Sequence, residues 1–209
     1  MKQVQVFPAL PVYGSFIISR KVFAMKKLIK PLRIILPVSL VLTFITAAVL
    51  LFTPFGYPAV KAATYDFGFF DFRFSYTADN VMTVLSHYNG DRTAELTRFY
   101  VIDFILAFFA AVFCVTLPMT FYSKNDKHYL LFRASAFSGL MAFIFNVIEN
   151  ILLLRIVNVM PYFSEGDADL ASGITSLKWV FIGIWLLTTL LFIITTVISD
   201  NKKARGRQR

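Results

Sequence analysis

Four long apolar stretches constrain the fold of this chain more than any other feature of its sequence. A hydrocarbon core about 30 Å thick needs roughly 20 apolar residues of helix at about 1.5 Å each, and four stretches reach this length. They cover residues 34–52, 99–121, 134–157 and 176–198, with prolines or polar segments between them. The sequence therefore predicts an all-α fold, an integral membrane four-helix bundle with a partly structured extracytoplasmic first loop.

The composition favours the same class of protein. Of the 209 residues, 57% are hydrophobic, 24 are Phe and only 16% are charged, which differs from an ordinary soluble domain. A net charge of +9 would suggest nucleic-acid binding in a soluble chain, but here the basic residues gather at the two ends and in one short loop. An excess of Lys and Arg marks the cytoplasmic side of a membrane protein, so no nucleic-acid partner is expected.

The distribution of charge also predicts the orientation. Basic residues precede the first apolar stretch, recur in the segment SKNDKH and return in the tail NKKARGRQR, whereas the segment SEGDADL is acidic. In a four-span chain the three basic segments lie on one side, so both termini are expected to be cytoplasmic. The predicted organisation is a basic N-terminal segment (1–33), a membrane domain (34–199) and a basic tail (200–209).

The beginning of the chain allows two interpretations. Met25 opens the segment MKKLIKPLR, which resembles a fresh start of a membrane protein, so either Met1 or Met25 is the true start and residues 1–24 form a loose extension. A cleavable signal with its cut near Val60 and Ala62 is a rival reading. Its apolar core of about 19 residues exceeds the usual length of roughly 7 to 15, so a retained first span is expected.

The first loop contains a pattern of its own. Phe70, Phe72, Phe74 and Tyr76 alternate with polar residues, which is the period-two pattern of an extended segment with one apolar face. The following residues, TADNVMTVLSHYNG, predict a short helix that Thr77 caps and Asn-Gly ends. We expect this helix to lie on the outer interface or to cover the bundle.

The segment FNVIENILLLR places four polar residues inside the third span. At 100° per residue, Asn146, Glu149 and Asn150 fall on one face together with small residues such as Gly139. Small residues let a neighbouring helix approach closely, so this face is expected to contact protein. Arg155 falls roughly opposite Asn146 and is expected to reach the outer headgroups.

Two other spans carry polar residues on narrow faces. Asp103 shares a face with Ala107, Ala110 and Cys114 in the second span, and Lys178 lies on one face of the fourth. The third span leaves the membrane where the second and fourth enter it. Asp103 and Lys178 therefore lie about one turn, and Glu149 about two turns, from the same surface.

These residues are expected to meet and to pair. An unpaired charge at a helix centre costs between ~3 and more than ~10 kcal/mol, depending on the method. Pairing of Lys178 with Glu149 or with Asp103 would leave one carboxylate over, and that group could carry a proton. The candidate polar cluster, with two residues at its rim that could close it, comprises Asp103, Asn146, Glu149, Asn150, Lys178, Arg98 and Tyr100.

Other chemistry is not favoured by the sequence. His87 and His128 are far apart in loops, and Cys114 is the single cysteine, so no metal site and no disulfide is expected. Asp167 and Asp169 are better explained as a solvated acidic patch than as cation ligands. Phosphate-loop, zinc-protease, nucleophile-elbow and dinucleotide motifs are missing, so no cofactor is expected.

Three motifs resemble a family. LTRFYVIDF at the head of the second span, VIENILL in the third and LKW in the fourth are similar to a group of small four-span bacterial membrane proteins without a characterised activity. The resemblance covers about residues 72–196. It implies that Asp103, Glu149, Asn150 and Lys178 belong to one recurring constellation, and it implies a bacterial cytoplasmic membrane. Asn146 stands where that pattern predicts an acid.

Three functions remain open from the sequence. The first is binding of a lipid or another small amphiphile in an outward-facing polar pocket, as part of an envelope assembly. The second is an intramembrane lipid-modifying enzyme, an isomerase or transferase with Glu149 and Asp103 as acid and base. The third is a structural partner subunit of an envelope complex. Membrane lipids, another membrane protein and a second copy of the chain are therefore the expected partners.

Overall fold

The structure is a computed structural model that describes residues 13–64, 70, 73–88, 91–121 and 128–206. Within these residues the chain forms α-helices and no β-strand, so the predicted all-α fold is confirmed. The helices are α1 (Tyr13–Phe52), α2 (Tyr57–Ala63), α3 (Ala78–Ser86), α4 (Arg92–Phe121), α5 (Tyr129–Val159) and α6 (Glu165–Gly206).

Four segments are long and apolar enough to cross a membrane: Pro31–Ala63, Thr93–Phe121, Tyr129–Val159 and Glu165–Ser199. Their outer faces expose many large apolar side chains, up to 79% for Leu130. An apolar surface of this extent marks contact with a membrane. The prediction of an integral, multi-pass membrane protein is confirmed at this level.

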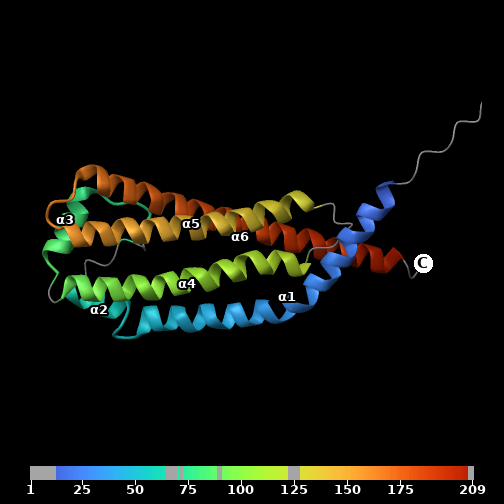
Figure 1. Ribbon diagram of the computed structural model, residues 1–209, viewed down its shortest axis with the longest axis horizontal. Helices are drawn as coiled ribbons and strands as arrows, with labels where there is room; N and C mark the ends of the chain where they lie inside the picture. The colour runs from blue at the N-terminus through green and yellow to red at the C-terminus, as the bar shows by residue number, and fades with distance from the viewer. Residues whose placement is uncertain (1–12, 65–69, 71–72, 89–90, 122–127, 207–209) are drawn as a thin grey trace, which may run out of the picture.

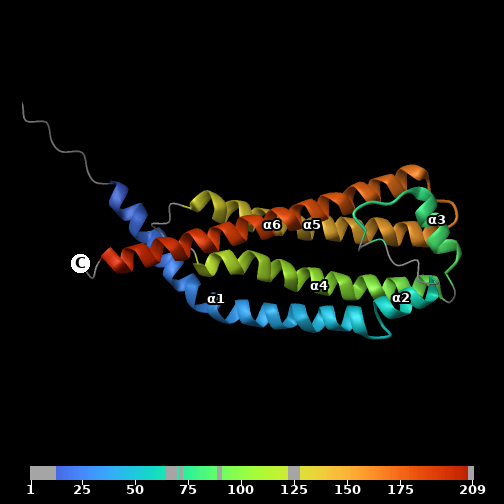
Figure 2. The ribbon, with the colours of Figure 1, turned by 180° about the vertical axis from the view of Figure 1, so that it is seen from behind.

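The long helices pack against one another in chain order. α1 packs against α4, α4 against α5 and α5 against α6, with a smaller contact between α4 and α6. Figures 1 and 2 show the beginning of α1 and the end of α6 at one end of the bundle, and α2 and α3 at the other. Three helices, α4, α5 and α6, therefore contact one another directly, and α1 lies outside them against α4.

The buried apolar core lies at the end of the bundle that carries α3. There Val81, Val84 and Leu85 of α3 pack into one cluster with Tyr100 of α4 and Ile156 of α5. Elsewhere the spans keep apolar side chains on their outer faces. The fold thus encloses one end of the α4–α5–α6 unit more completely than the rest.

The predicted capping of α3 is confirmed. The side chain of Thr77 accepts the backbone N–H of Asn80, and the Asn80 side chain accepts the N–H of Thr77, a reciprocal capping box. Asp91 likewise accepts the N–H of Ala94 at 3.1 Å at the start of α4. The Asn89-Gly90 stop lies outside the described residues.

Tyr88 ties the end of α3 to the start of α4. Its hydroxyl donates to a carboxylate oxygen of Glu95 at 2.7 Å. Burial and the neighbouring Glu95 carboxylate raise the pKa of Tyr88 above its ordinary value. The phenol therefore remains a hydrogen-bond donor in this position.

The predicted single apolar face of the first loop is wrong. Phe70 and Tyr76 are buried with their ring centroids 4.8 Å apart, but Phe74 is 60% exposed. The chain bends at Arg73 and Phe74, because hydrogen bonds to α6 hold the segment in an irregular path, and the alternation is lost. Phe72 lies outside the described residues.

Two predicted boundaries are also wrong. The segment PYFSEGDADLASG (161–173), which the sequence predicts as the loop between the third and fourth spans, is helical from Glu165 onward. Ser164 and Asp167 cap this helix reciprocally: the Asp167 carboxylate accepts the N–H and hydroxyl of Ser164, and Ser164 Oγ accepts the N–H of Asp167. Acidic residues in the first turn also suit the helix dipole, so α6 begins well before its apolar part.

The segment before the first span differs from expectation too. α1 begins at Tyr13, so the expected loose extension 1–24 is helical from that residue. A short helix, α2, follows Gly56 and was not predicted; Pro58 stands in its first turn. Proline is favoured there because the N–H it lacks has no intrahelical partner.

Candidate functional site

The first half of the polar cluster joins α5 to α6, and we call Glu149, Thr175 and Lys178 the Glu149 group. Nζ of Lys178 lies 2.5 Å from Oε2 of Glu149, and the Thr175 hydroxyl donates to Oε1 at 2.6 Å. Glu149 and Thr175 are fully buried and Lys178 is 4% exposed. Both carboxylate oxygens thus have a partner, and the charge of Glu149 is compensated by an adjacent ammonium.

The second half joins α4 to α5, and we call Asp103, Asn146 and Asn150 the Asp103 group. Nδ2 of Asn146 and Nδ2 of Asn150 both donate to Oδ2 of Asp103, each at 2.7 Å. Asn150 is fully buried, whereas Asp103 and Asn146 are half-buried. Among the described residues no basic side chain forms an ion pair with Asp103.

The Asp103 group also has acceptors without donors. Oδ1 of Asn150 is buried and receives no hydrogen bond from the described part of the chain. Oδ1 of Asp103 and Oδ1 of Asn146 also receive no hydrogen bond from the described residues. These two residues are partly accessible. A buried polar group without a partner is uncommon and asks for an explanation. Both amide nitrogens face the carboxylate, so the amide oxygens are the atoms without a donor.

A segment of the first loop, residues 74–76, packs over the Glu149 group. The backbone N–H of Tyr76 donates to Oγ of Ser172 at 2.9 Å, and Ser176 donates to the carbonyl of Phe74 at 2.7 Å. The Tyr76 hydroxyl lies 3.3 Å from Oγ1 of Thr175, which itself contacts Glu149. Figure 2 shows this segment running from α3 back along α6.

A close crossing of α4, α5 and α6 lies at Gly139. A Cβ added there would stand 2.8 Å from Cβ of Cys114 and 3.0 Å from Cδ1 of Trp185, so only glycine fits. The indole N–H of Trp185 donates to the Cys114 carbonyl at 3.0 Å. The prediction that small residues on α5 allow a close helix approach is confirmed.

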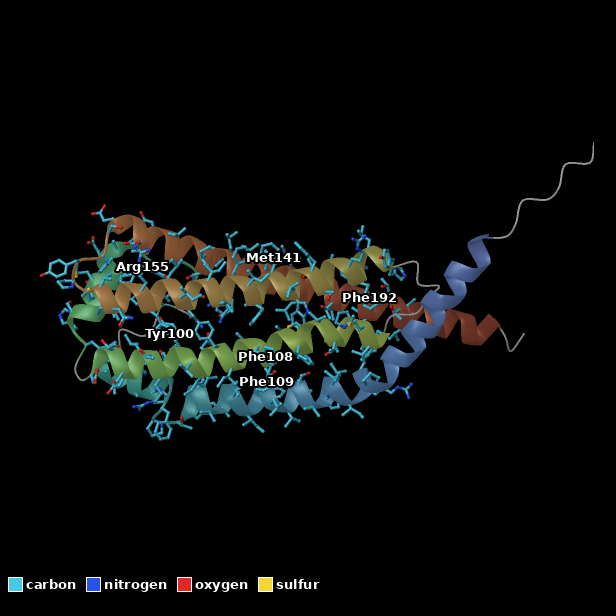
Figure 3. All side chains as sticks on the ribbon, viewed as in Figure 1. Tyr100, Phe108, Phe109, Met141, Arg155 and Phe192 are labelled. Atoms are coloured by element: carbon cyan, nitrogen blue, oxygen red, sulfur yellow. The ribbon has the colours of Figure 1, made fainter. Side chains whose placement is uncertain are left out.

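Among the remaining predicted residues, Arg98 and Arg155 make contacts outside the two groups. Arg98 is exposed and stacks over the ring of Phe55 at 5.8 Å, so it points away from the cluster. Tyr100 is fully buried, with its ring edge-on to Phe99. Arg155 is 65% exposed and pairs with Asp167 at 3.6 Å; Figure 3 shows both Arg155 and Tyr100 in the half of the bundle that carries α3.

Three contributors were missed by reading the sequence. Ser172 falls in the segment expected as a loop, Thr175 falls between that segment and the fourth predicted span, and Tyr76 was assigned only to an apolar face. The Ser-x-x-Asp spacing at Ser164 would have placed the start of α6 earlier. Thr175 would then have fallen one turn before Lys178, on its own face.

The arrangement can hold a proton or a ligand, and it differs from a metal centre. Within the described residues no three His, Cys, Asp or Glu side chains lie close enough to bind a metal ion. One carboxylate has a lysine partner, and the other offers acceptor atoms beside a half-exposed surface. Comparisons with protein-family models, with curated proteins and with solved structures gave no match.

Proposed function

We propose that this protein binds a lipid or another small amphiphile through the Asp103 group. The observation that carries the proposal is the buried Oδ1 of Asn150, which lacks a donor beside a carboxylate that lacks a cation. Burying such groups without partners costs about 1–3 kcal/mol for the amide and more for the charge. A ligand with donor groups offsets this cost.

The partial exposure of Asp103 and Asn146 supports an approach from outside the helices. Both residues lie within spans, where the surrounding medium is lipid rather than water. The head of an amphiphile can therefore meet the carboxylate while its apolar part stays against the exposed faces of α4 and α5. This division matches the usual build of ligand sites, which are mostly apolar with a few convergent polar groups.

In this proposal the Glu149 group has a structural role. Its carboxylate is fully buried and already engaged by Lys178 and Thr175. A general acid or base must reach the proton that it moves, and this burial does not favour such a role for Glu149. Lipid binding is therefore preferred to lipid modification, and the Glu149 group is assigned to holding α5 and α6 together.

The proposed location is the bacterial cytoplasmic membrane with both termini in the cytoplasm. The support is the charge pattern of the sequence and the position of the beginning of α1 and the end of α6 at one end of the bundle (Figure 1). In this orientation α3 and the polar cluster lie near the extracytoplasmic surface.

The proposal is tested by identifying lipids that stay with the purified protein. The full chain is extracted in a mild detergent, and bound lipids are identified by native mass spectrometry for wild type and Asn150→Leu. Asn158→Leu is the matched control, since Asn158 is an exposed asparagine on the same helix whose amide bonds only the Leu154 carbonyl. We expect a lipid on wild type and Asn158→Leu that is lost from Asn150→Leu.

Equal lipid retention by all three proteins would contradict the proposal, provided that thermal unfolding shows Asn150→Leu to be folded. Loss from Asn158→Leu as well would mean that the lipid coats the helices without using the Asp103 group.

A further inference from the structure

The charges of the polar cluster do not balance. The described cluster contains two carboxylates, Asp103 and Glu149, and one ammonium, Lys178, which pairs with Glu149. No cation of the described cluster is therefore left to pair with Asp103, which lies inside a span. Charges at such depth are almost always paired, so a compensating cation is required if Asp103 is ionised.

The acceptor geometry narrows the kind of cation. Oδ1 of Asp103, of Asn146 and of Asn150 receive no hydrogen bond from the described residues. Each asparagine oxygen shares a carbon with a nitrogen that is 2.7 Å from Oδ2 of Asp103, so all three oxygens lie within a few ångströms of the carboxylate. The group therefore offers three acceptors without a donor, and each amide nitrogen keeps one further N–H.

Different cations fit this set unequally. A primary ammonium has three N–H donors and one positive charge, which matches three acceptors and one uncompensated carboxylate. A calcium ion takes about six to eight oxygen ligands, more than the group supplies. A hydroxyl-bearing head would satisfy acceptors but would leave the charge of Asp103 uncompensated.

On this basis, and resting on the proposed function, we propose that the amphiphile bound by the Asp103 group carries a primary ammonium. The ammonium donates to the three Oδ1 atoms and neutralises Asp103, while Oδ2 keeps its two amide donors. Two sources share this chemistry, an aminophospholipid headgroup and a free amine. Asn146 and Asn150 thereby orient the carboxylate and complete the acceptor set.

The test uses a series of lipids in which methyl groups replace the N–H donors one at a time. The purified full chain is titrated with dioleoyl phosphatidylethanolamine and with its mono-, di- and trimethylated forms, and binding is measured by native mass spectrometry. All four heads keep their positive charge. Each methylation removes one charge-assisted hydrogen bond, so wild-type affinity should fall stepwise, by about tenfold or more for each bond lost.

Variants assign the effect to the site. In Asp103→Asn the four lipids should bind with similar, weak affinity, whereas Asp169→Asn, an exposed acid on α6, should behave as wild type. Asn146→Ala is a second variant that removes one acceptor and keeps the charge, and it should reduce the preference in part. Thermal unfolding of each variant in the same detergent checks that it is folded.

The outcomes separate this inference from the proposed function. Wild-type binding that is equal for all four lipids but lost in Asp103→Asn would overturn the proposal of a primary ammonium. It would leave the proposal of lipid binding at the Asp103 group intact. Absence of any saturable binding that depends on Asp103 would overturn both. Ethanolamine added as a soluble competitor separates the sources: displacement of the lipid assigns the site to the ammonium alone, and retention assigns it to the headgroup with its chains.

Discussion

Glu149 and Asp103 are both carboxylates inside apolar helices of the same unit, yet their surroundings differ. Glu149 is fully buried, with an ammonium at 2.5 Å and a hydroxyl at 2.6 Å on its two oxygens. Asp103 is half-buried, and two amides donate to one of its oxygens while the other receives no hydrogen bond from the described residues. The first group is complete within the chain, and the second is not.

The difference predicts separate roles for the two groups. The Glu149 group stabilises the fold, and the Asp103 group binds a ligand. Removing one partner of a buried ion pair leaves an uncompensated charge and is strongly destabilising. Removing an incompletely satisfied charge from an apolar span relieves a cost. Substitutions in the Glu149 group should therefore change the free energy of unfolding, and substitutions in the Asp103 group should change binding.

The largest expected effect is that of Lys178→Met. The Glu149 carboxylate would be left buried without its ammonium, and we expect the unfolding free energy to fall by about 3–5 kcal/mol. Thermal unfolding in detergent and the yield of folded protein measure this effect. The double variant Glu149→Leu with Lys178→Met removes both charges and should recover most of the loss; a double variant as unstable as the single one would contradict the pairing.

The second-largest effect is expected at Gly139, where α4, α5 and α6 cross closely. Gly139→Leu would push Cys114 and Trp185 away from α5, and overpacking of this kind costs about 1–3 kcal/mol. Gly183→Leu is the control, because an added Cβ at Gly183 meets nothing within 4 Å. We expect lower thermal stability and weaker lipid binding for Gly139→Leu alone. Equal behaviour of the two variants would mean that the crossing is not tightly packed.

Asp103→Asn should affect stability much less than Lys178→Met. The substituted amide keeps an oxygen that can accept from Asn146 and Asn150, and it removes the uncompensated charge. We expect the unfolding free energy to change by less than about 1 kcal/mol, or to rise. Thermal unfolding in lipid-free detergent checks this. A drop as large as that of Lys178→Met would show that Asp103 is a structural clamp like Glu149.

The smallest effect is expected at the outer surface. Arg155 and Asp167 are 65% and 24% exposed and 3.6 Å apart, and exposed ion pairs contribute little to stability. Arg155→Met leaves the capping role of Asp167 intact and should lower thermal stability only slightly. The difference from wild type should disappear at high salt, since salt screens exposed charges. A larger, salt-independent loss would place Arg155 among the structural ion pairs.

Much of the fold follows from the sequence because it depends on long, regular patterns. Helix length and apolar content predict the four membrane-crossing segments, and helical periodicity places Asn146, Glu149 and Asn150 on one face. The close approach at Gly139 follows from the same periodicity. Each of these features is determined within one helix, so no knowledge of neighbouring helices is needed.

The partners within the cluster depend on several helices at once. Depth in the membrane places Asp103 and Lys178 at one level and Glu149 a turn deeper. Depth alone therefore does not decide which of the two carboxylates pairs with Lys178. That choice is made by the lateral positions of α4 and α6 around α5, and by a lysine side chain long enough to cover a turn. Thr175 was missed because a cap at Ser164 starts α6 inside a polar segment.

The chain order of these contacts has a consequence for biosynthesis. Asp103 on α4 finds its amide donors on α5, the next span to be made, and Glu149 on α5 finds its lysine on α6, the span after that. The spans α4 and α5 thus each enter the bilayer with a polar group that pairs with the following span. The nascent protein cannot leave its insertion machinery one helix at a time without cost, so α4, α5 and α6 should be released together, after Lys178 has emerged.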